Sequence, residues 1–147
     1  MKIETHIKIL LNSFRHWTGK DLVPVDKDIE KCIQNLWKTP FVIVSHGVEK
    51  DPILNYGNEM ALKLWEMSWD EFVKIPSRLT VEPVNQEARD RLLARVTLNG
   101  FIEDYSGVRI TSTGKRFFIE KAIVWNLLDQ NNNYCGQAAT FSDWRYL

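Results

Sequence analysis

The sequence predicts an α+β fold in which helices cover both faces of a five-stranded antiparallel sheet. The first observation is the segment 105–125, YSGVRITSTGKRFFIEKAIVW, where apolar and β-branched residues flank a Ser-Thr-Gly-Lys turn, as in an antiparallel hairpin. The second is the helical spacing of apolar residues over the first 37 positions. The third is the order along the chain, which runs from helices to two strands, further helices and three strands.

The size and charge of the chain limit its function. Its 147 residues suit one unit that buries roughly two-thirds of the surface its unfolded form exposes. Because 19 Lys and Arg balance 19 Asp and Glu, no net field attracts nucleic acid or an anionic membrane. Charges interrupt the apolar N-terminal stretch and no apolar run could span a bilayer, which favours a cytoplasmic protein. Cys32 and Cys135 are then expected to be reduced thiols.

Residues 1–39 are expected to form an N-terminal helical extension ahead of a domain at residues 40–147. The first predicted helix carries its apolar residues at helical spacing, at Ile3, Ile7, Leu10, Leu11, Phe14 and Trp17. Gly19 is its expected stop signal. A second helix is predicted to begin at a cap, Asp26 or Asp28, and to end before Pro40.

Two strands and a set of helices are predicted next. The continuous β-branched segment 41–46, FVIVSH, is typical of a strand buried on both faces, and residues 53–56 predict a second strand. Asn58 is expected to cap a helix, and Ser68 with Glu71 matches the capping-box pattern. Asn85 is expected to cap a longer helix.

The longer helix has an apolar and a charged face. Ala88, Leu92 and Val96 are expected to face inward. The charged residues are expected to face mostly outward; they are Glu87, Arg89, Asp90, Arg91 and Arg95. We interpret the arginines as a solvated face with local ion pairs, and the alternative is a basic recognition surface.

Three strands are predicted at the end of the chain, at 101–110, 116–128 and 134–144. With a period of two, the middle strand points Phe117, Ile119, Ile123, Trp125 and Leu127 to one face and Phe118, Ala122, Val124 and Leu128 to the other. Both faces are apolar, so both need a cover. The helices of residues 58–99 are expected to cover one face. The N-terminal helices, alone or with a partner subunit, are expected to cover the other.

No catalytic or metal-binding motif is recognisable, so the sequence does not predict an enzyme. Ser45 and His46 adjoin on a strand and point to opposite faces, which argues against a nucleophile and base pair. His6 and His16 are expected at the surface or at an interface. The histidines and cysteines do not cluster as metal ligands do.

Polar residues interrupt the last three strands, at Glu103, Arg109, Glu120, Asn126 and Gln137. A buried charge persists only when it is paired. These residues are therefore expected to be paired or exposed, or else to orient a ligand in an apolar pocket.

The arrangement of strands around an Asn-capped helix resembles a PAS domain, a five-stranded antiparallel sheet with helices across one face. More specifically, residues 41–144 resemble the MEKHLA domain, which occurs alone in bacteria and at the C-terminus of plant class III homeodomain-leucine zipper proteins. The residues that carry the resemblance are Ser45-His46-Gly47, Asn55-Tyr56-Gly57-Asn58, Gly107-Val108, Ser112, Gly114, Glu120, Ala122, Val124-Trp125, Cys135, Phe141 and Trp144. The chain lacks a homeodomain and a zipper, so the resemblance does not imply DNA binding.

The resemblance implies a sensory or regulatory module, and a small ligand is expected between the sheet and the helices of residues 58–99. The candidate lining residues are Tyr56, Arg78, Trp125 and Asn126. The ligand is not identified. Flavin-binding PAS domains carry a reactive Cys in the helix after the Asn-capped one, and the corresponding segment IPSRLTVEP has none, so the resemblance disfavours a covalent flavin adduct and leaves non-covalent flavin open. Haem-binding members commonly use a His on the long helix, and residues 85–99 contain none, which disfavours haem. The alternative is an interaction module that forms a homodimer through the N-terminal helices and the sheet.

Overall fold

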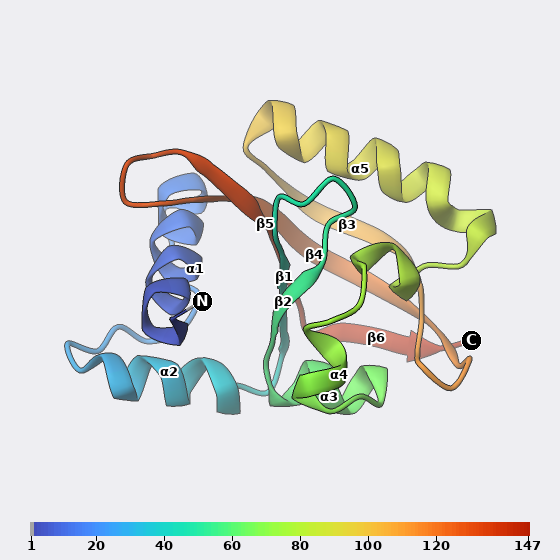
Figure 1. Ribbon diagram of the computed structural model, residues 1–147, viewed down its shortest axis with the longest axis horizontal. Coiled ribbons are helices and arrows are strands. Elements are labelled where there is room, and N and C mark those ends of the chain that lie inside the picture. Colours follow the sequence, from blue (N-terminus) through green and yellow to red (C-terminus); the bar gives the residue numbers. More distant parts are fainter. Residues whose placement is uncertain (1) are drawn as a thin grey trace.

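One open antiparallel sheet forms the centre of the computed structural model, which describes residues 2–147 (Figure 1). Its strands run in the order β2-β1-β5-β4-β3, and β6 pairs with β4. The bounds are β1 Val42–His46, β2 Leu54–Gly57, β3 Phe101–Ile110, β4 Arg116–Leu128, β5 Tyr134–Phe141 and β6 Asp143–Tyr146. The predicted five-stranded antiparallel sheet is confirmed. The single last strand predicted over 134–144 is wrong, because the chain breaks at Ser142 and continues as β6.

Helices lie on both sides of the sheet, as predicted. Their bounds are α1 Ile3–Thr18, α2 Ile29–Lys38, α3 Glu59–Trp65, α4 Trp69–Phe72 and α5 Gln86–Asn99, with 3₁₀ turns η1 at Ser77–Thr80 and η2 at Pro83–Asn85. Figure 1 shows α1 and α2 on one side of the sheet and α3, α4 and α5 on the other. We call the α1 side the N-terminal face and the α5 side the cavity face.

Most of the predicted helix signals act as expected. Gly19 ends α1 in the left-handed region, at φ 73°. The Asp28 side chain accepts a hydrogen bond from the Glu30 amide and caps α2. Ser68 and Glu71 form the reciprocal capping box at α4. Asn85 is an exception: it precedes α5, but its side chain makes no cap bond, because η2 already leads into the helix with a φ of −106° and a ψ of 2°.

Asn58 uses its whole hydrogen-bonding capacity. Its side-chain oxygen accepts from the Ala61 amide at the start of α3 and from the Ile43 amide of β1, both at 3.1 Å. Its side-chain nitrogen donates to the carbonyl oxygens of Leu36, in α2, and Phe41, at 3.1 and 2.8 Å. The side chain is fully buried. One amide therefore joins α2, β1 and α3.

A bulge in β4 changes which residues face the helices. Lys121 has a φ of 55°, and Asp104 on the paired strand β3 has a φ of 60°, where the pairing register shifts. Phe117 and Ile119 pack on the cavity face before the bulge, whereas Ile123, Trp125 and Leu127 pack on the N-terminal face after it. The predicted common face for these five residues is therefore wrong, since a strict period of two does not survive an extra residue.

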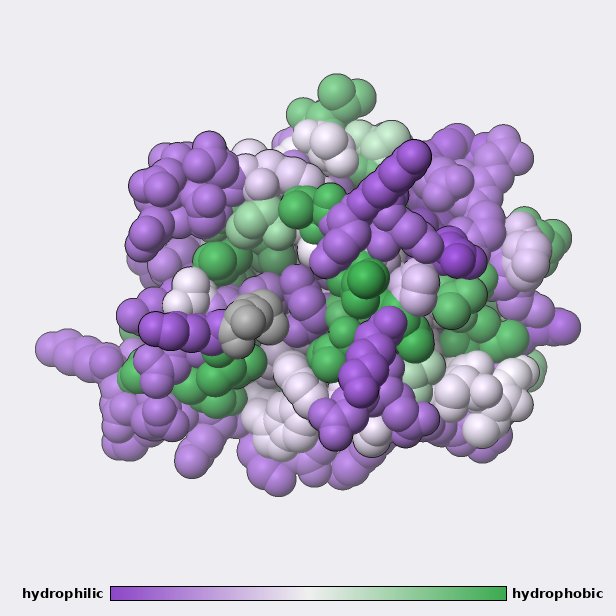
Figure 2. Space-filling view, in the orientation of Figure 1, coloured by the Kyte–Doolittle hydropathy of each residue, from purple (hydrophilic) through white to green (hydrophobic). Residues whose placement is uncertain are grey.

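The core has a separate cluster on each side of the sheet. On the N-terminal face, α1 and α2 pack with Trp125, Leu127 and Tyr56. On the cavity face, α3 and α4 pack with Phe117 and Ile119, and α5 packs its Leu92 and Val96 against Val124. Both α1 and α2 share a core with the sheet. The predicted division of the chain into an extension at residues 1–39 and a domain at residues 40–147 therefore stays a prediction. Figure 2 shows that hydrophilic residues cover most of the viewed surface, with smaller hydrophobic patches between them.

Candidate functional site

A cavity of about 80 Å³ lies between the sheet and the elements η1 and α5. Its apolar lining comes mainly from the strands and α5 and includes Val44, Leu54, Phe72, Leu92, Leu93, Ile119, Ala122, Val124, Ala139 and Phe141. Its polar lining comprises Ser45, His46, Trp65, Ser77, Thr80, Arg89, Tyr105, Arg109 and Gln137. The combination of an apolar wall with a few converging polar groups is typical of small-molecule sites.

Arg89 is the charged residue buried deepest in this lining, with 9% of its surface exposed. Its guanidinium donates a short hydrogen bond to Ser77 Oγ and lies 3.5 Å from Asp90 Oδ1. The Asp90 side chain is 70% exposed, so water screens much of this ion pair. Burial and the nearby charge of Arg109 lower the pKa of Arg89. The remaining guanidinium N–H groups leave Arg89 with spare donor capacity.

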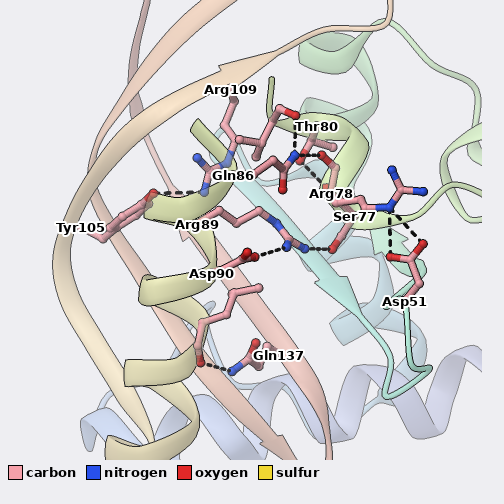
Figure 3. Close-up of polar contacts among 12 residues, drawn as sticks. Asp51, Ser77, Arg78, Thr80, Gln86, Arg89, Asp90, Tyr105, Arg109 and Gln137 are labelled. Atoms are coloured by element: carbon pink, nitrogen blue, oxygen red, sulfur yellow. Dashed lines mark hydrogen bonds and ion pairs between the residues drawn. The ribbon is translucent and has the colours of Figure 1, made fainter. Parts of the chain in front are cut away.

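Arg109 brings a second guanidinium to the same cavity from β3. It donates to Tyr105 Oη at 3.2 Å and lies over the Tyr105 ring, 5.5 Å from the ring centre (Figure 3). Among residues 2–147, no carboxylate lies within 4.0 Å of the Arg109 nitrogens. The cavity therefore holds two cations and one partly solvated carboxylate partner.

Two more lining residues have a buried ring nitrogen without a partner in the described part of the chain. His46 Nδ1 donates to the Gly47 carbonyl at 3.0 Å; its Nε2 has no partner at hydrogen-bond geometry, although the Gln137 side chain lies close enough to raise the pKa of the ring. Burial, aided by the charge of Arg89, lowers the pKa of His46, so the ring is neutral at pH 7 and Nε2 is an acceptor. The Trp65 indole N–H is also buried and unpaired. Such groups cost free energy unless a ligand or water satisfies them.

Gln137 lines the cavity beside α5, and Asn126 lies behind it on β4. Gln137 Nε2 donates to Asn126 Oδ1 at 3.1 Å and to the Leu93 carbonyl oxygen at 3.2 Å. Asn126 Nδ2 donates to the Val96 carbonyl at 3.0 Å. Structural pairing accounts for both amides.

None of the four predicted lining residues lines this cavity. Tyr56 and Trp125 are buried on the N-terminal face, because β2 and the second half of β4 turn these side chains toward α1. Asn126 lies behind Gln137. Arg78 is half exposed and pairs with Asp51, with Nε 3.0 Å from Oδ2. That these four side chains contact a ligand stays a prediction that the structure does not test.

Sequence reasoning missed the central residue of the cavity. The prediction that Arg89 faces outward is wrong: it lies three and seven residues before Leu92 and Val96, on the inward face of α5. The helical spacing of Arg89 from Leu92 and Val96 is the sequence signal that indicates its inward position. Arg109 and Gln137 were recognised as polar interruptions of the strands, and both line the cavity.

A buried polar chain lies on the N-terminal face, and it includes the hydroxyl of Ser45, a residue that also borders the cavity. His6 Nε2 lies 2.8 Å from Ser45 Oγ, which donates to Asn55 Oδ1 at 2.5 Å. Because the serine hydroxyl gives its proton to Asn55, the imidazole donates to Ser45 and cannot act as its base. The predicted surface or interface role is therefore wrong for His6, which is 5% exposed and packs between α1 and the sheet, whereas His16 is exposed.

Two further features are absent from the described residues. Residues 2–147 contain no group of three His, Cys, Asp or Glu side chains placed to hold a metal ion. No helix over the same residues has the length and apolar character needed to cross a bilayer.

Comparison with solved structures defines the class of fold. A PAS domain from Colwellia psychrerythraea matches 81% of this chain and 96% of its own length with a TM-score of 0.68 at 13% identity. The fungal blue-light photoreceptor Vivid, in its light-state dimer, matches 95% of this chain and 93% of its own with a TM-score of 0.63 at 16% identity. The chain thus has a PAS-like fold.

The sequence match identifies the family. Residues 4–146 match the MEKHLA domain, and the chain belongs to this family. Its curated relatives include homeobox-leucine zipper proteins, such as HOX9 of Oryza sativa subsp. indica, 21% identical over 139 residues, and ATHB-9 of Arabidopsis thaliana, 22% identical over 149 residues. The matches cover 94% and 97% of this chain but only 16% and 18% of those proteins.

Proposed function

We propose that this chain is a non-enzymatic sensory domain that binds a small ligand in the cavity between the sheet and α5. The observation that carries the proposal is the set of buried polar groups around the cavity, above all the partly paired Arg89. A domain that needed only stability would fill this space with apolar side chains. The neutral net charge gives no support to nucleic-acid binding, so the homeobox part of the relatives' names is not carried over.

A bound flavin does not fit the cavity. One structural neighbour is a light-oxygen-voltage domain studied with a flavin analogue, at 15% identity and a TM-score of 0.59. A cavity of roughly 150 Å³ accepts one benzene ring. The cavity here has about 80 Å³, too little for the three fused rings of a flavin, and neither Cys32 nor Cys135 is among its lining residues.

Native mass spectrometry of the full chain tests the proposal directly. Protein purified from cells is expected to carry a small molecule that leaves on mild activation, and its addition back should shift the NMR signals of Ala139 and Val124 at the cavity. A protein that is free of small molecules, and whose cavity signals respond to no compound in a metabolite library, would contradict the proposal.

A second candidate function is homodimerisation through the part of the sheet that the helices leave open. Phe118 pairs with Val108 and Arg145 across the strands, on the side opposite the buried Phe117 and Ile119. This patch is partly exposed. If it forms a dimer, Phe118→Lys is expected to halve the mass measured by light scattering, whereas Leu98→Lys, on exposed α5, should leave it unchanged. A wild-type mass of one chain would rule it out.

A further inference from the structure

The ligand can be described further by its charge, size and polarity, if the cavity binds a ligand as proposed above. The first step is charge. Arg89 and Arg109 both line the cavity, while the carboxylate beside Arg89 is 70% exposed and none lies within 4.0 Å of Arg109 among the described residues. A buried cation is stable only with an anion close by. A ligand carboxylate would supply that anion, and the planar guanidinium forms two parallel hydrogen bonds to it.

The second step is size. One water occupies about 30 Å³ of liquid, and about 150 Å³ accepts benzene. The cavity of about 80 Å³ therefore suits roughly three to six non-hydrogen atoms. Its wall of Leu92, Val124 and Phe141 favours a short carbon chain over a phosphate ion, which has four polar oxygens and no apolar surface.

The third step is the remaining polarity. The Trp65 indole offers a donor, and His46 offers an acceptor at Nε2, because its Nδ1 proton is committed to the Gly47 carbonyl. A carboxylate alone accepts hydrogen bonds and cannot satisfy His46. A hydroxyl group on the ligand could donate to Nε2 and accept from a neighbouring donor.

We infer that the cavity takes a short hydroxycarboxylate of two or three carbons, with its carboxylate on Arg89 and Arg109 and its hydroxyl on His46. Glycolate is the simplest compound with this chemistry. Its matched probes are glycolamide, which has nearly the same shape without the charge, and acetate, which lacks the hydroxyl.

Titration calorimetry on the full chain at pH 7 and constant ionic strength tests the inference. Glycolate is expected to bind at least about tenfold more tightly than glycolamide, because each hydrogen bond to a charged group is stronger than its neutral equivalent. Glycolate is also expected to bind more tightly than acetate. Inorganic phosphate serves as the competing anion, and tighter binding of phosphate than of glycolate would overturn the assignment.

Variants show which residues produce the preference for a charged ligand and for a hydroxyl group. Arg89→Gln is expected to remove the preference for glycolate over glycolamide. Arg91→Gln is the matched control, since Arg91 lies on the same helix with its side chain 66% exposed and paired with Glu87. His46→Phe should remove the advantage of glycolate over acetate. If circular dichroism shows that Arg89→Gln is unfolded, Arg109→Gln provides the same test from β3, and an unchanged charge preference in it would contradict the inference.

The outcomes separate this inference from the proposed function. If neutral and charged probes bind equally at the cavity, the ligand class is wrong and the binding site stands. If no probe binds and native mass spectrometry finds no small molecule, both are wrong.

Discussion

Leu10 and Leu92 lie on opposite faces of one sheet and meet different surroundings. Leu10, in α1, is fully buried in a cluster with Phe14 and Trp125, whose rings lie 4.9 Å apart. Leu92, in α5, lines the cavity.

The polar groups of the two faces also differ in how completely they are paired. On the N-terminal face, His6, Ser45 and Asn55 form a closed chain, and Ser13 exchanges two hydrogen bonds with the backbone of Leu128. On the cavity face, Arg89 and Arg109 retain spare donors. Both faces bury unpaired ring groups, at Tyr56 and Trp125 on the N-terminal face and at His46 and Trp65 on the cavity face. The comparison teaches that charge separates the faces, since the cavity face adds two guanidinium groups with spare donors.

The largest expected effect comes from making one substitution on each face. Leu10→Ala is expected to destabilise the protein by about 3–5 kcal/mol, because it opens a new cavity in a packed cluster. Leu92→Ala should cost about 2–3 kcal/mol, since part of its surroundings is already empty. Urea unfolding measures both. An equal or larger cost for Leu92→Ala would remove the proposed difference between the faces.

The next largest expected effect is a loss of stability at acid pH. Burial lowers the pKa of His6 from 6.5 to about 4. The unfolded chain therefore takes up a proton at higher pH than the folded one, and stability falls as the pH drops from about 6.5 to about 4. The loss from this group is expected to approach roughly 3 kcal/mol. His6→Gln, which can still donate to Ser45, should make the profile shallower over this range of pH and leave the contribution of His46, whose pKa burial also lowers. Profiles that superimpose would show that His6 does not control it.

Two adjacent alanines of β5 are expected to show stability changes of opposite sign for the same substitution. Ala139 packs beside Leu92 and Val124 at the cavity, whereas Ala138, which also borders the cavity, packs in the cluster under α1. Ala139→Val is expected to stabilise the fold by about 1 kcal/mol and to weaken ligand binding, because it fills empty space. Ala138→Val should instead destabilise it by about 1–3 kcal/mol through overpacking. Thermal unfolding would reveal the opposite signs, and a shared sign would contradict the contrast in packing.

The smallest effect concerns Tyr56. Its hydroxyl is buried on the N-terminal face without a partner in the described residues, and burial raises its pKa. Tyr56→Phe is therefore expected to leave stability unchanged or to raise it by up to about 1 kcal/mol. A clear loss of stability in calorimetry would indicate that the hydroxyl has a partner, such as an ordered water.

Much of the fold could be predicted because its signals are local. The strand bounds at 101–110 and 116–128 and the caps at Asn58 and Ser68 follow from residue types and spacing. The bulge at Lys121 could not be predicted in this way, since Lys rarely adopts a positive φ and only the pairing with β3 imposes it.

The candidate site was predicted less well because it depends on that bulge and on one helix orientation. Once β4 changes faces, Trp125 turns away from α5, and the lining passes to residues such as Ile119, Ala122 and Val124. Arg89 was assigned outward by its charge, although its spacing from Leu92 placed it inward. Residue type and position conflicted there, and such conflicts are often functional.

The buried side chain of Asn58 connects elements on both faces of the sheet through hydrogen bonds. Its amide is satisfied only while α2, β1 and α3 keep their present positions. A displacement of α3 would break bonds that also hold the end of α2, at about 1–3 kcal/mol for each buried group left unpaired. The helices beside the cavity and those on the far side of the sheet are thus coupled in free energy. Hydrogen exchange at the Ile43 amide would report on that coupling.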